Sequence, residues 1–295
     1  MAPRTKKRSG GSVPIAMLTD FGYRDHYVGA MKGVIASIAP GAPVIDITHG
    51  VPAQSILAGA IALAQSWRLF PPQTVFMVVV DPGVGTTRLP VAVQTRAGAR
   101  FIGPDNGVLS LALEEAGPAR AVELRSPRYR LANVSTTFHG RDIFAPAAAH
   151  LWRGVKLEAL GPSLREGLTR LDVPEPREGI EELRGEVLYV DSFGNLVSNI
   201  GRDALAQFEA RFPAMRLSVR IDGGAPMEIV QAYGDVHKGV PLAAFGSFEL
   251  LEIAVRDGSA AQHFAAGPGA IVTVRPLRRT LRHEVKVRNK PLASK

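Results

Sequence analysis

The first half of the chain alternates between short apolar runs and longer segments with a helical repeat. Four apolar runs, each followed by turn residues or an aspartate, fall at 15–18, 44–47, 75–80 and 90–94. In the segments 27–38 and 55–67, apolar residues recur every three or four positions, as on one face of a helix. Strands and helices in alternation form a layered α/β fold with a mostly parallel sheet flanked by helices. We therefore predict an α/β N-terminal domain for residues 13–172.

The pattern changes after a stretch rich in proline, glycine and charge. Residues 173–184 contain Pro174, Pro176 and Gly179 without an alternating pattern, so they are predicted to be a linker. Beyond them, short alternating runs separated by turn residues fall at 185–190, 215–221, 227–231 and 270–274. Short strands at this spacing indicate a smaller all-β, barrel-like C-terminal domain over residues 185–276.

The positive charge of the chain is concentrated at its two ends. The 295 residues carry a formal net charge of +8 and no cysteine, so disulfides and thiolate chemistry are excluded. Residues 1–12 carry +4 and residues 275–295 carry +7, which leaves −3 on residues 13–274. We interpret 1–12 and 277–295 as flexible basic tails and expect no nucleic-acid partner. No apolar run is long enough for a membrane span or a secretory signal, and a cytoplasmic protein is expected.

Carboxylates stand directly after two of the apolar runs. Asp20 follows the first run, and Asp81 follows the third and precedes two glycines and Arg88. In open α/β sheets, ligand-binding groups gather at the carboxyl ends of the strands, where a carboxylate often accepts ribose hydroxyls. Structural roles stay open at this point: a helix cap for Asp20 or Asp25, and an ion pair across a turn for Asp81 and Arg88. Neither GxGxxG nor a P-loop is present, so no pyrophosphate cradle and no ATP hydrolysis are expected.

Two more polar motifs have both a structural and a functional interpretation. His139 lies in a polar stretch before a helix predicted to begin near Ile143, where a histidine is either structural or catalytic. Phe193 and Asn195 belong to a turn that follows a predicted strand. A plain hairpin would account for them, and so would stacking and amide pairing with a base.

Seven motifs in a fixed order resemble one protein family. They span about residues 15–260 and are TDFG, DITHGV, DPGVG with the following Arg88, GPDNG, FHGRDIF, DSFGNL and GSFELLEIAV. The chain is similar to the S-adenosyl-L-methionine hydroxide adenosyltransferases, which are related to enzymes that attack the same carbon with fluoride or chloride. The resemblance implies an α/β N-terminal and a β-barrel C-terminal domain. It also implies a homotrimer, with the ligand held between the N-terminal domain of one chain and the C-terminal domain of the next.

The resemblance assigns a catalytic set and a substrate-binding set. The catalytic set is Asp81, Arg88 and His139; halide-using relatives differ at the acidic and imidazole positions, so the chain resembles the water-using branch. It implies hydrolysis of S-adenosyl-L-methionine to adenosine and L-methionine, with no cofactor and no metal. Whether Asp81 or His139 is the base stays open. The substrate-binding set is Asp20, Asp25, Phe138, Asp191, Phe193, Asn195, Ser247, Ala254 and Arg256.

Within that set, the resemblance places each part of the substrate. Asp20 would bind the ribose hydroxyls, Asp191 the methionine ammonium and Ser247 the methionine carboxylate. Phe193, Asn195 and the segment 254–256 would contact the adenine. One position departs from the family, because relatives usually carry asparagine where this chain has Arg256. The side-chain contact there is in doubt, whereas a backbone contact can persist.

Two rival functions remain open from the residues alone. One is a metal-dependent phosphate or nucleotide hydrolase, whose candidate ligands would be Asp20, Asp46, His49, Asp81, Asp105 and His139. Arg88 argues against it, because a guanidinium among the ligands repels a cation. The other rival is a non-catalytic protein that binds an adenosyl ligand, and only product formation separates it from the enzyme.

Overall fold

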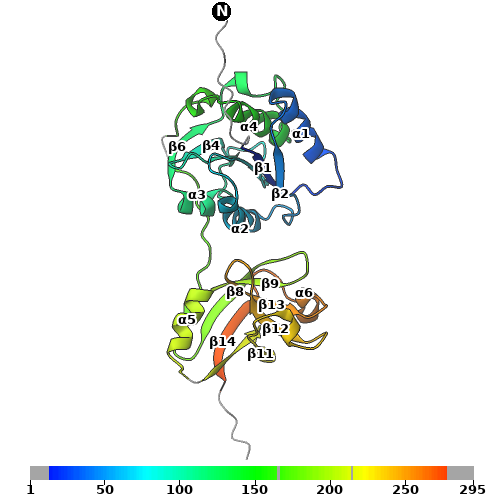
Figure 1. Cartoon of the computed structure of the whole chain (residues 1–295), viewed down its shortest axis with the longest axis vertical. Coiled ribbons are helices and arrows are strands. Elements are labelled where there is room, and N and C mark those ends of the chain that lie inside the picture. Colours follow the sequence, from blue (N-terminus) through cyan, green and yellow to red (C-terminus); the bar gives the residue numbers. More distant parts are fainter. Residues whose placement is uncertain (1–12, 165–166, 214, 278–295) are drawn as a thin grey trace, which may run out of the picture. The chain divides into compact units, whose positions relative to one another are not determined.

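The computed structural model describes residues 13–164, 167–213 and 215–277. The chain divides into two compact units, Met1–Val173 (unit 1) and Pro174–Lys295 (unit 2), each described by itself below (Figure 1). The predicted basic tails lie outside the described residues, apart from Leu277. Among the described residues, no helix is both long enough and apolar enough to cross a membrane.

Unit 1 is built on a six-stranded sheet with the order β2-β1-β3-β5-β4-β6 (Figure 1). The strands are β1 Ile15–Thr19, β2 Val44–Thr48, β3 Val75–Val79, β4 Pro90–Thr95, β5 Arg100–Pro104 and β6 Pro118–Glu123. Strands β2, β1, β3 and β5 are parallel, and β4 is antiparallel to both of its neighbours. Every residue of β1 and β3 is buried, which explains their unbroken apolar sequences. The predicted mostly parallel sheet is confirmed.

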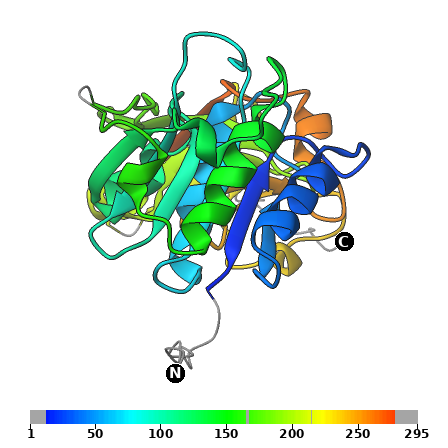
Figure 2. The ribbon, with the colours of Figure 1, turned by 90° about the horizontal axis from the view of Figure 1, so that it is seen from above.

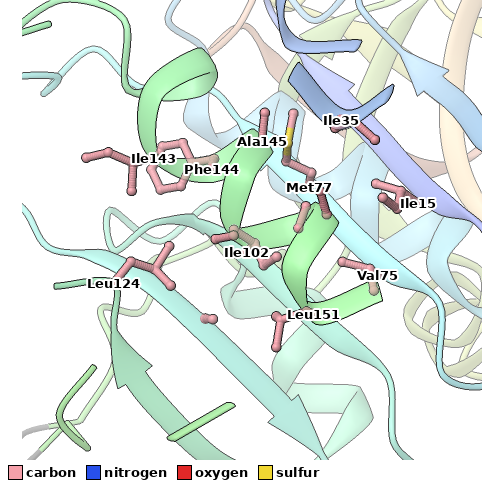
Figure 3. Packing of buried hydrophobic residues seen from close by; sticks show 14 of the residues in the cluster. Ile15, Ile35, Val75, Met77, Ile102, Leu124, Ile143, Phe144, Ala145 and Leu151 are labelled. Atoms are coloured by element: carbon pink, nitrogen blue, oxygen red, sulfur yellow. The ribbon is translucent and has the colours of Figure 1, made fainter. Parts of the chain in front are cut away.

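Helices flank this sheet in two pairs. Their bounds are α1 Tyr27–Ile38, α2 Ile56–Ser66, α3 Ser110–Ala116 and α4 Ala145–Trp152. Helix α1 packs beside α4, and α2 packs beside α3 (Figures 1 and 2). Ile15, Val75 and Met77 belong to the core cluster that includes α1 and α4 (Figure 3). Successive strand residues point to opposite faces, so one apolar strand supplies both layers.

Short helical turns complete unit 1. The 3-10 turns are η1 Trp67–Leu69, η2 Pro127–Tyr129 and η4 Leu157–Leu160, and η3, Gly140–Phe144, is a π-helical turn. The helix predicted to begin near Ile143 therefore begins at Ala145 and is preceded by this wider turn. Residues placed on a π-helical turn often belong to functional sites.

Unit 2 is an antiparallel sheet that curls into a nearly closed barrel. Its strands are β7 Arg177–Glu178, β8 Leu183–Val190, β9 Leu196–Gly201, β10 Arg216–Ile221, β11 Met227–Glu228, β12 Pro241–Phe245, β13 Leu250–Val255 and β14 Ile271–Leu277. The order is β11-β10-β14-β8-β9-β13-β12, with β7 paired to β8. A bridge between Ile229 and Ala243 joins the two ends of this order. The predicted barrel-like domain is confirmed.

Two features of unit 2 differ from the prediction. The segment 173–184 contains the two-residue strand β7, and β8 begins inside it at Leu183. The unit also carries two helices, α5 Arg202–Ala210 and α6 Ala260–Phe264, that the strand-like pattern did not indicate. The apolar residues Ala204, Leu205 and Phe208 of α5 do recur at a helical spacing, but over nine residues, which is shorter than the window needed to establish a helical repeat.

Candidate active site

The segment after β3 turns back on itself and brings Arg88 to Asp81. The N–H of Val84 donates to the carbonyl of Asp81 at 3.2 Å, and the N–H of Thr86 donates to the carbonyl of Gly83 at 3.1 Å. Gly85 has φ +78°, and a Cβ there would lie 2.5 Å from the carbonyl oxygen of Thr136. Glycine is therefore required for the turn to approach the segment that carries His139.

Asp81 and Arg88 form a two-pronged ion pair. Arg88 Nε donates to Asp81 Oδ1 at 2.9 Å, and Arg88 Nη2 donates to Asp81 Oδ2. The side chains are only 6% and 8% exposed. The guanidinium also lies over the ring of Phe144, 5.5 Å from its centre. An Arg–carboxylate fork of this kind fixes both groups in direction as well as in distance.

His139 completes a chain of three groups. Its Nδ1 lies 2.7 Å from Arg88 Nη2. Because a guanidinium only donates, Nδ1 is the acceptor, and a neutral ring then carries its proton on Nε2. Burial, followed by the charge of Arg88, lowers the pKa of His139 below its usual value. The neutral form is therefore favoured, and the three residues expected to form the catalytic set are neighbours in space.

A buried carboxylate holds the segment that leads to His139. Asp142, fully buried in η3, accepts the N–H of Ser135 at 2.8 Å and the Nε of Arg141 at 2.6 Å. Burial alone would raise the pKa of Asp142, but these hydrogen bonds lower it overall. The carbonyl of Asp142 also accepts the N–H of Leu131 at 2.9 Å. Asp142 thus anchors both ends of the 131–135 segment.

The structure places Asp20 and Asp25 differently. Asp20 follows β1, which pairs with β3, so Asp20 and Asp81 follow neighbouring parallel strands at the same edge of the sheet. Asp20 Oδ2 accepts the N–H of Gln54 at 2.8 Å, and Oδ1 has no hydrogen-bond partner among the described residues. Asp25 is exposed, and the N-cap of α1 is His26 rather than Asp25.

Aromatic rings connect the Asp20 turn with the His139 segment. Phe138 is buried, and its ring lies 6.0 Å from Phe21 and 5.1 Å from Tyr27, edge to face in both cases. Its other neighbour is the guanidinium of Arg141, 5.1 Å from the ring centre. Phe138 therefore packs between the Asp20 turn and the His139 segment and contacts both.

The side chains considered as metal ligands do not converge. His49 and Asp46 face each other, and Asp105 accepts the N–H of Thr169 at 2.8 Å. Asp81 and His139 are separated by the cationic Arg88. Within the described ranges, no three His, Cys, Asp or Glu side chains are arranged to hold a metal ion.

In unit 2, Asp191 organises the turn after β8. Its Oδ1 accepts the N–H groups of Phe193 at 2.9 Å and Asn195 at 2.8 Å, and Oδ2 accepts the side-chain amide of Asn195 at 2.9 Å. Gly194 has φ +83°, and a Cβ there would lie 2.1 Å from Ser259 Oγ. The turn leaves Phe193 78% exposed.

This turn borders a cavity of about 940 Å³. Among the predicted substrate-binding residues, those that line it are Asp191, Phe193, Asn195, Ser247 and Arg256. Ala254 does not line it, because its side chain is buried in a small cluster with Leu242 and Ala244. The guanidinium of Arg256 donates to the carbonyls of Gly234 and Val236, so this side chain already holds the segment 234–236, most of which belongs to the 3-10 turn η5, Tyr233–Asp235.

Two cavity residues were missed from the sequence. Tyr233 OH donates to Glu252 Oε2 at 2.8 Å, and no cationic side chain pairs with Glu252 among the residues described. Burial, followed by the charge of Asp191, raises the pKa of Glu252, and burial with Glu252 raises the pKa of Tyr233 to about 12. A Cβ on Gly246 would overlap Glu252 Oε1, at 1.8 Å. The available signal was a single carboxylate inside the apolar strand sequence LLEIAV.

Comparison with known families accounts for both units. The model of the SAM hydroxide adenosyltransferase N-terminal domain matches residues 15–161, and that of the C-terminal domain matches residues 185–273. The chain belongs to the SAM hydroxide adenosyltransferase family. The predicted family membership is therefore confirmed.

Two named relatives and one solved structure are similar to this chain over most of its length. It is 41% identical to a protein of Thermus thermophilus named (R)-S-adenosyl-L-methionine hydrolase, over 84% of this chain and 93% of that one. A fluorinase of Nocardia brasiliensis is 30% identical over 73% of this chain and 80% of its own. The crystal structure of an uncharacterized conserved protein from Thermotoga maritima superposes with a TM-score of 0.80 at 40% identity, covering 88% and 99% of the two chains.

Proposed function

We propose that this protein is a hydrolase that splits S-adenosyl-L-methionine into adenosine and L-methionine. The observation that carries the proposal is the linked set Asp81, Arg88 and His139 at the carboxyl edge of the parallel sheet. The names of the family members at about 40% identity support the substrate and the reaction. Because those names specify the (R) form at sulfur, we propose the (R) sulfonium as the substrate here as well.

The reaction needs an activated water rather than an acid. Water oxygen attacks C5′, the C5′–S bond breaks, and its electron pair stays on sulfur, which leaves as the neutral thioether of methionine. One proton is released from the water. A positioned base contributes about 10²–10⁴ in rate, and holding the water in line with sulfur contributes further.

The hydrogen bonds favour Asp81 as the base. The Nδ1 of His139 is occupied by Arg88, and its Nε2 then carries a proton and can only donate to water. Each oxygen of Asp81 accepts one N–H from Arg88 and keeps a second lone pair. In this scheme Asp81 takes the proton, His139 orients the water, and Arg88 stabilises the developing hydroxide.

The same carboxylate disfavours halide as the nucleophile. An anion about 4 Å from Asp81 would be repelled by about 4 kcal/mol at an effective dielectric constant near 20. Arg88 offsets part of this repulsion, but its pairing with Asp81 reduces what it offers to an anion. A neutral water is not repelled, and it gains from a base that chloride cannot use.

Residues of both units would bind the substrate. Asp20 offers its free Oδ1 to the ribose hydroxyls. In the cavity of unit 2, Asp191 and Glu252 would bind the methionine ammonium, and Ser247 the carboxylate. Phe193 and Asn195 remain the proposed adenine contacts, whereas the engaged guanidinium of Arg256 leaves only backbone contacts at 255–257.

The deciding experiment is chromatography of the products formed by pure protein. The two sulfonium epimers are incubated separately at neutral pH, with and without chloride and with and without a chelator. Adenosine and methionine in equal amounts, from the (R) epimer and unaffected by chelation, are expected. Loss of activity on chelation would instead support the metal-dependent hydrolase, and adenosyl binding without any product would support the non-catalytic binding protein.

We further propose a homotrimer in which each site is shared by neighbouring protomers, as the family resemblance implies. Light scattering after size exclusion measures the mass. Activity regained on mixing two inactive variants, Asp81→Asn and Asp191→Asn, would support shared sites. The cytoplasmic location stays a prediction, which cell fractionation tests.

A further inference from the structure

A second cluster of polar and ionisable groups lies in unit 1, next to the Asp20 turn. It consists of Thr19, Tyr23, Lys32, Asp46 and His49. His49 is 1% exposed and Thr19 is fully buried. Thr19 Oγ1 lies 2.7 Å from His49 Nδ1, and His49 Nε2 lies 3.1 Å from Asp46 Oδ1. The DITHGV motif, which contains Asp46 and His49, takes no part in the scheme above.

The surroundings of His49 determine where its proton resides. Nε2 and Asp46 Oδ1 are buried and face each other at 3.1 Å, and neither forms an aligned hydrogen bond with any group in the described part of the chain. A lone pair on Nε2 would therefore face a carboxylate, so the proton lies on Nε2. Nδ1 is then the acceptor, and the hydroxyl of Thr19 donates to it. Burial lowers the pKa of His49, which keeps this neutral form.

The order Thr19, His49, Asp46 matches that of a nucleophile, a base and an orienting acid. Catalysis at Thr19 is excluded by its burial, because its hydroxyl cannot reach a substrate. The hydroxyl instead accepts the N–H of Phe21 at 3.2 Å, and this hydrogen bond joins the two residues that flank Asp20. The N–H of Gly22 donates to the carbonyl of His49 at 2.7 Å. His49 thus holds the turn 19–22 through both its side chain and its backbone.

Asp46 anchors the other end of the relay. Its Oδ2 accepts Tyr23 OH at 2.8 Å and Lys32 Nζ at 2.7 Å, which links the middle of β2 to α1 and to the segment after the turn. Burial alone would raise the pKa of Asp46, but the hydrogen bonds from Lys32 and Tyr23 lower it overall. The carboxylate stays ionised and keeps the ring of His49 in one orientation.

We infer that the relay Asp46–His49–Thr19 is a positioning device that sets the direction of the Asp20 carboxylate toward the ribose hydroxyls. This rests on the proposed function, because it gives Asp20 the ribose role. It assigns His49 and Thr19 to substrate binding rather than to the chemical step. Changes in the relay should therefore raise KM and weaken adenosine binding while kcat changes little.

Four variants separate positioning from general stability. His49→Leu removes both contacts, whereas His49→Asn keeps an acceptor near the position of Nδ1. Thr19→Val removes the hydroxyl at constant shape, and Thr19→Ser restores it. The matched control is His150→Leu, since His150 is a partly buried histidine of α4 that lies against Tyr129, away from the sheet edge.

In His49→Leu and Thr19→Val, we expect KM and the Kd for adenosine to rise by about tenfold to a hundredfold, the loss for a hydrogen bond to the charged Asp20 carboxylate. Kcat should stay within about threefold. Thr19→Ser and His150→Leu should match the wild type, and His49→Asn should lie between. The inference would be overturned if kcat fell by the same factor as KM rose in all variants. Unchanged KM and Kd values in His49→Leu would overturn it as well.

A pH series adds a signature that a structural role would not give. The groups that face His49 are Asp46, Lys32, Tyr23 and Thr19. Adenosine affinity should be constant above about pH 6.5 and weaken as Nδ1 becomes protonated, and His49→Asn should remove most of this weakening. An identical pH dependence in wild type and His49→Asn would contradict the inference. If the wild type binds adenosine but releases none from S-adenosylmethionine, the proposed function fails while this affinity test still decides the role of His49.

Discussion

Asp81 in unit 1 and Glu252 in unit 2 differ in the charge of their hydrogen-bond partners. In unit 1, Asp81 is paired with a guanidinium that also binds His139. In the cavity of unit 2, Glu252 has a phenol as its hydrogen-bond partner, and burial, followed by the charge of Asp191, raises its pKa. The set of polar groups in unit 1 is complete without a ligand. In unit 2, Glu252 has no cationic partner among the described residues, because Arg256, which also lines the cavity, is bound to backbone carbonyls.

This difference separates two tasks. A catalytic group must already be oriented before the reaction, and its own neighbours in unit 1 provide that orientation. A binding group gains most when the ligand supplies the missing charge, which the cavity of unit 2 leaves open. The proposed substrate carries both a sulfonium and an ammonium group, which would supply cationic partners to the carboxylates of this cavity.

The largest expected effect tests the complete set in unit 1. Asp81→Asn keeps the shape of the side chain but removes the base, so kcat should fall by about 10²–10⁴. Adenosine release followed by chromatography measures it. The control Glu123→Gln changes another Arg-paired carboxylate of unit 1, that of Glu123 with Arg125, and should leave kcat unchanged. Wild-type turnover in Asp81→Asn would remove Asp81 from the mechanism.

The next effect tests the incomplete set in unit 2. Glu252→Gln should raise the Kd for S-adenosylmethionine by about tenfold to a hundredfold, the loss expected for a hydrogen bond to a charged group. The same change removes a repelled carboxylate, so the ligand-free protein should melt at a higher temperature. Calorimetry and thermal unfolding check the two results. Lower stability together with unchanged affinity would mean that Glu252 serves the fold and not the ligand.

A smaller effect concerns the turn that brings Arg88 to Asp81. Gly85→Ala introduces a Cβ into a left-handed residue and against the carbonyl of Thr136, and should lower the free energy of unfolding by about 1–3 kcal/mol. Gly117→Ala is the control, since Gly117 also has a positive φ but nothing within 4 Å of its Cβ. Denaturant titration compares the two variants. Equal losses would show that the approach to Thr136 is unimportant.

The smallest effect is a difference in pH response between the units. Burial lowers the pKa values of His49, His139 and His150 below 6.5, so the unfolded chain binds more protons, and unit 1 should lose stability as the pH falls below about 6.5. Glu252 has a raised pKa, so its contribution should grow as the pH falls toward 4.5. Hydrogen exchange read by mass spectrometry resolves each unit, after correction for the intrinsic rate. A parallel response in both units would contradict these assignments.

The sequence predicted the fold of unit 1 well, because strands of a parallel sheet that are buried on both faces have continuous apolar sequences. The family motifs predicted that Asp81, Arg88 and His139 belong to one site. From their spacing alone, only an ion pair and a separate histidine could have been predicted. Helix α5 was missed because its nine residues are fewer than the window in which a helical repeat can be recognised.

The remaining site features depend on contacts that no local pattern encodes. The engagement of Arg256 requires the segment 234–236 to fold over it, and the burial of Ala254 follows from the register of β13 against β12. Glu252 was not predicted as a site residue because its neighbours in β13 belong to the hydrophobic core. The proton on Nε2 of His139 could be assigned only once Arg88 was known to lie beside Nδ1.

The position of Asp81, Arg88 and His139 on two short connecting segments, outside the hydrogen-bonded ladder, has a consequence for descent within the family. On the proposed mechanism, the nucleophile can be exchanged by altering a few side chains of these segments while every strand pairing stays intact. Proteins named as a hydrolase and as a fluorinase are both relatives of this chain, which agrees with such an exchange. Grafting segments 81–88 and 135–142 between such relatives is accordingly the shortest engineering route from one chemistry to the other.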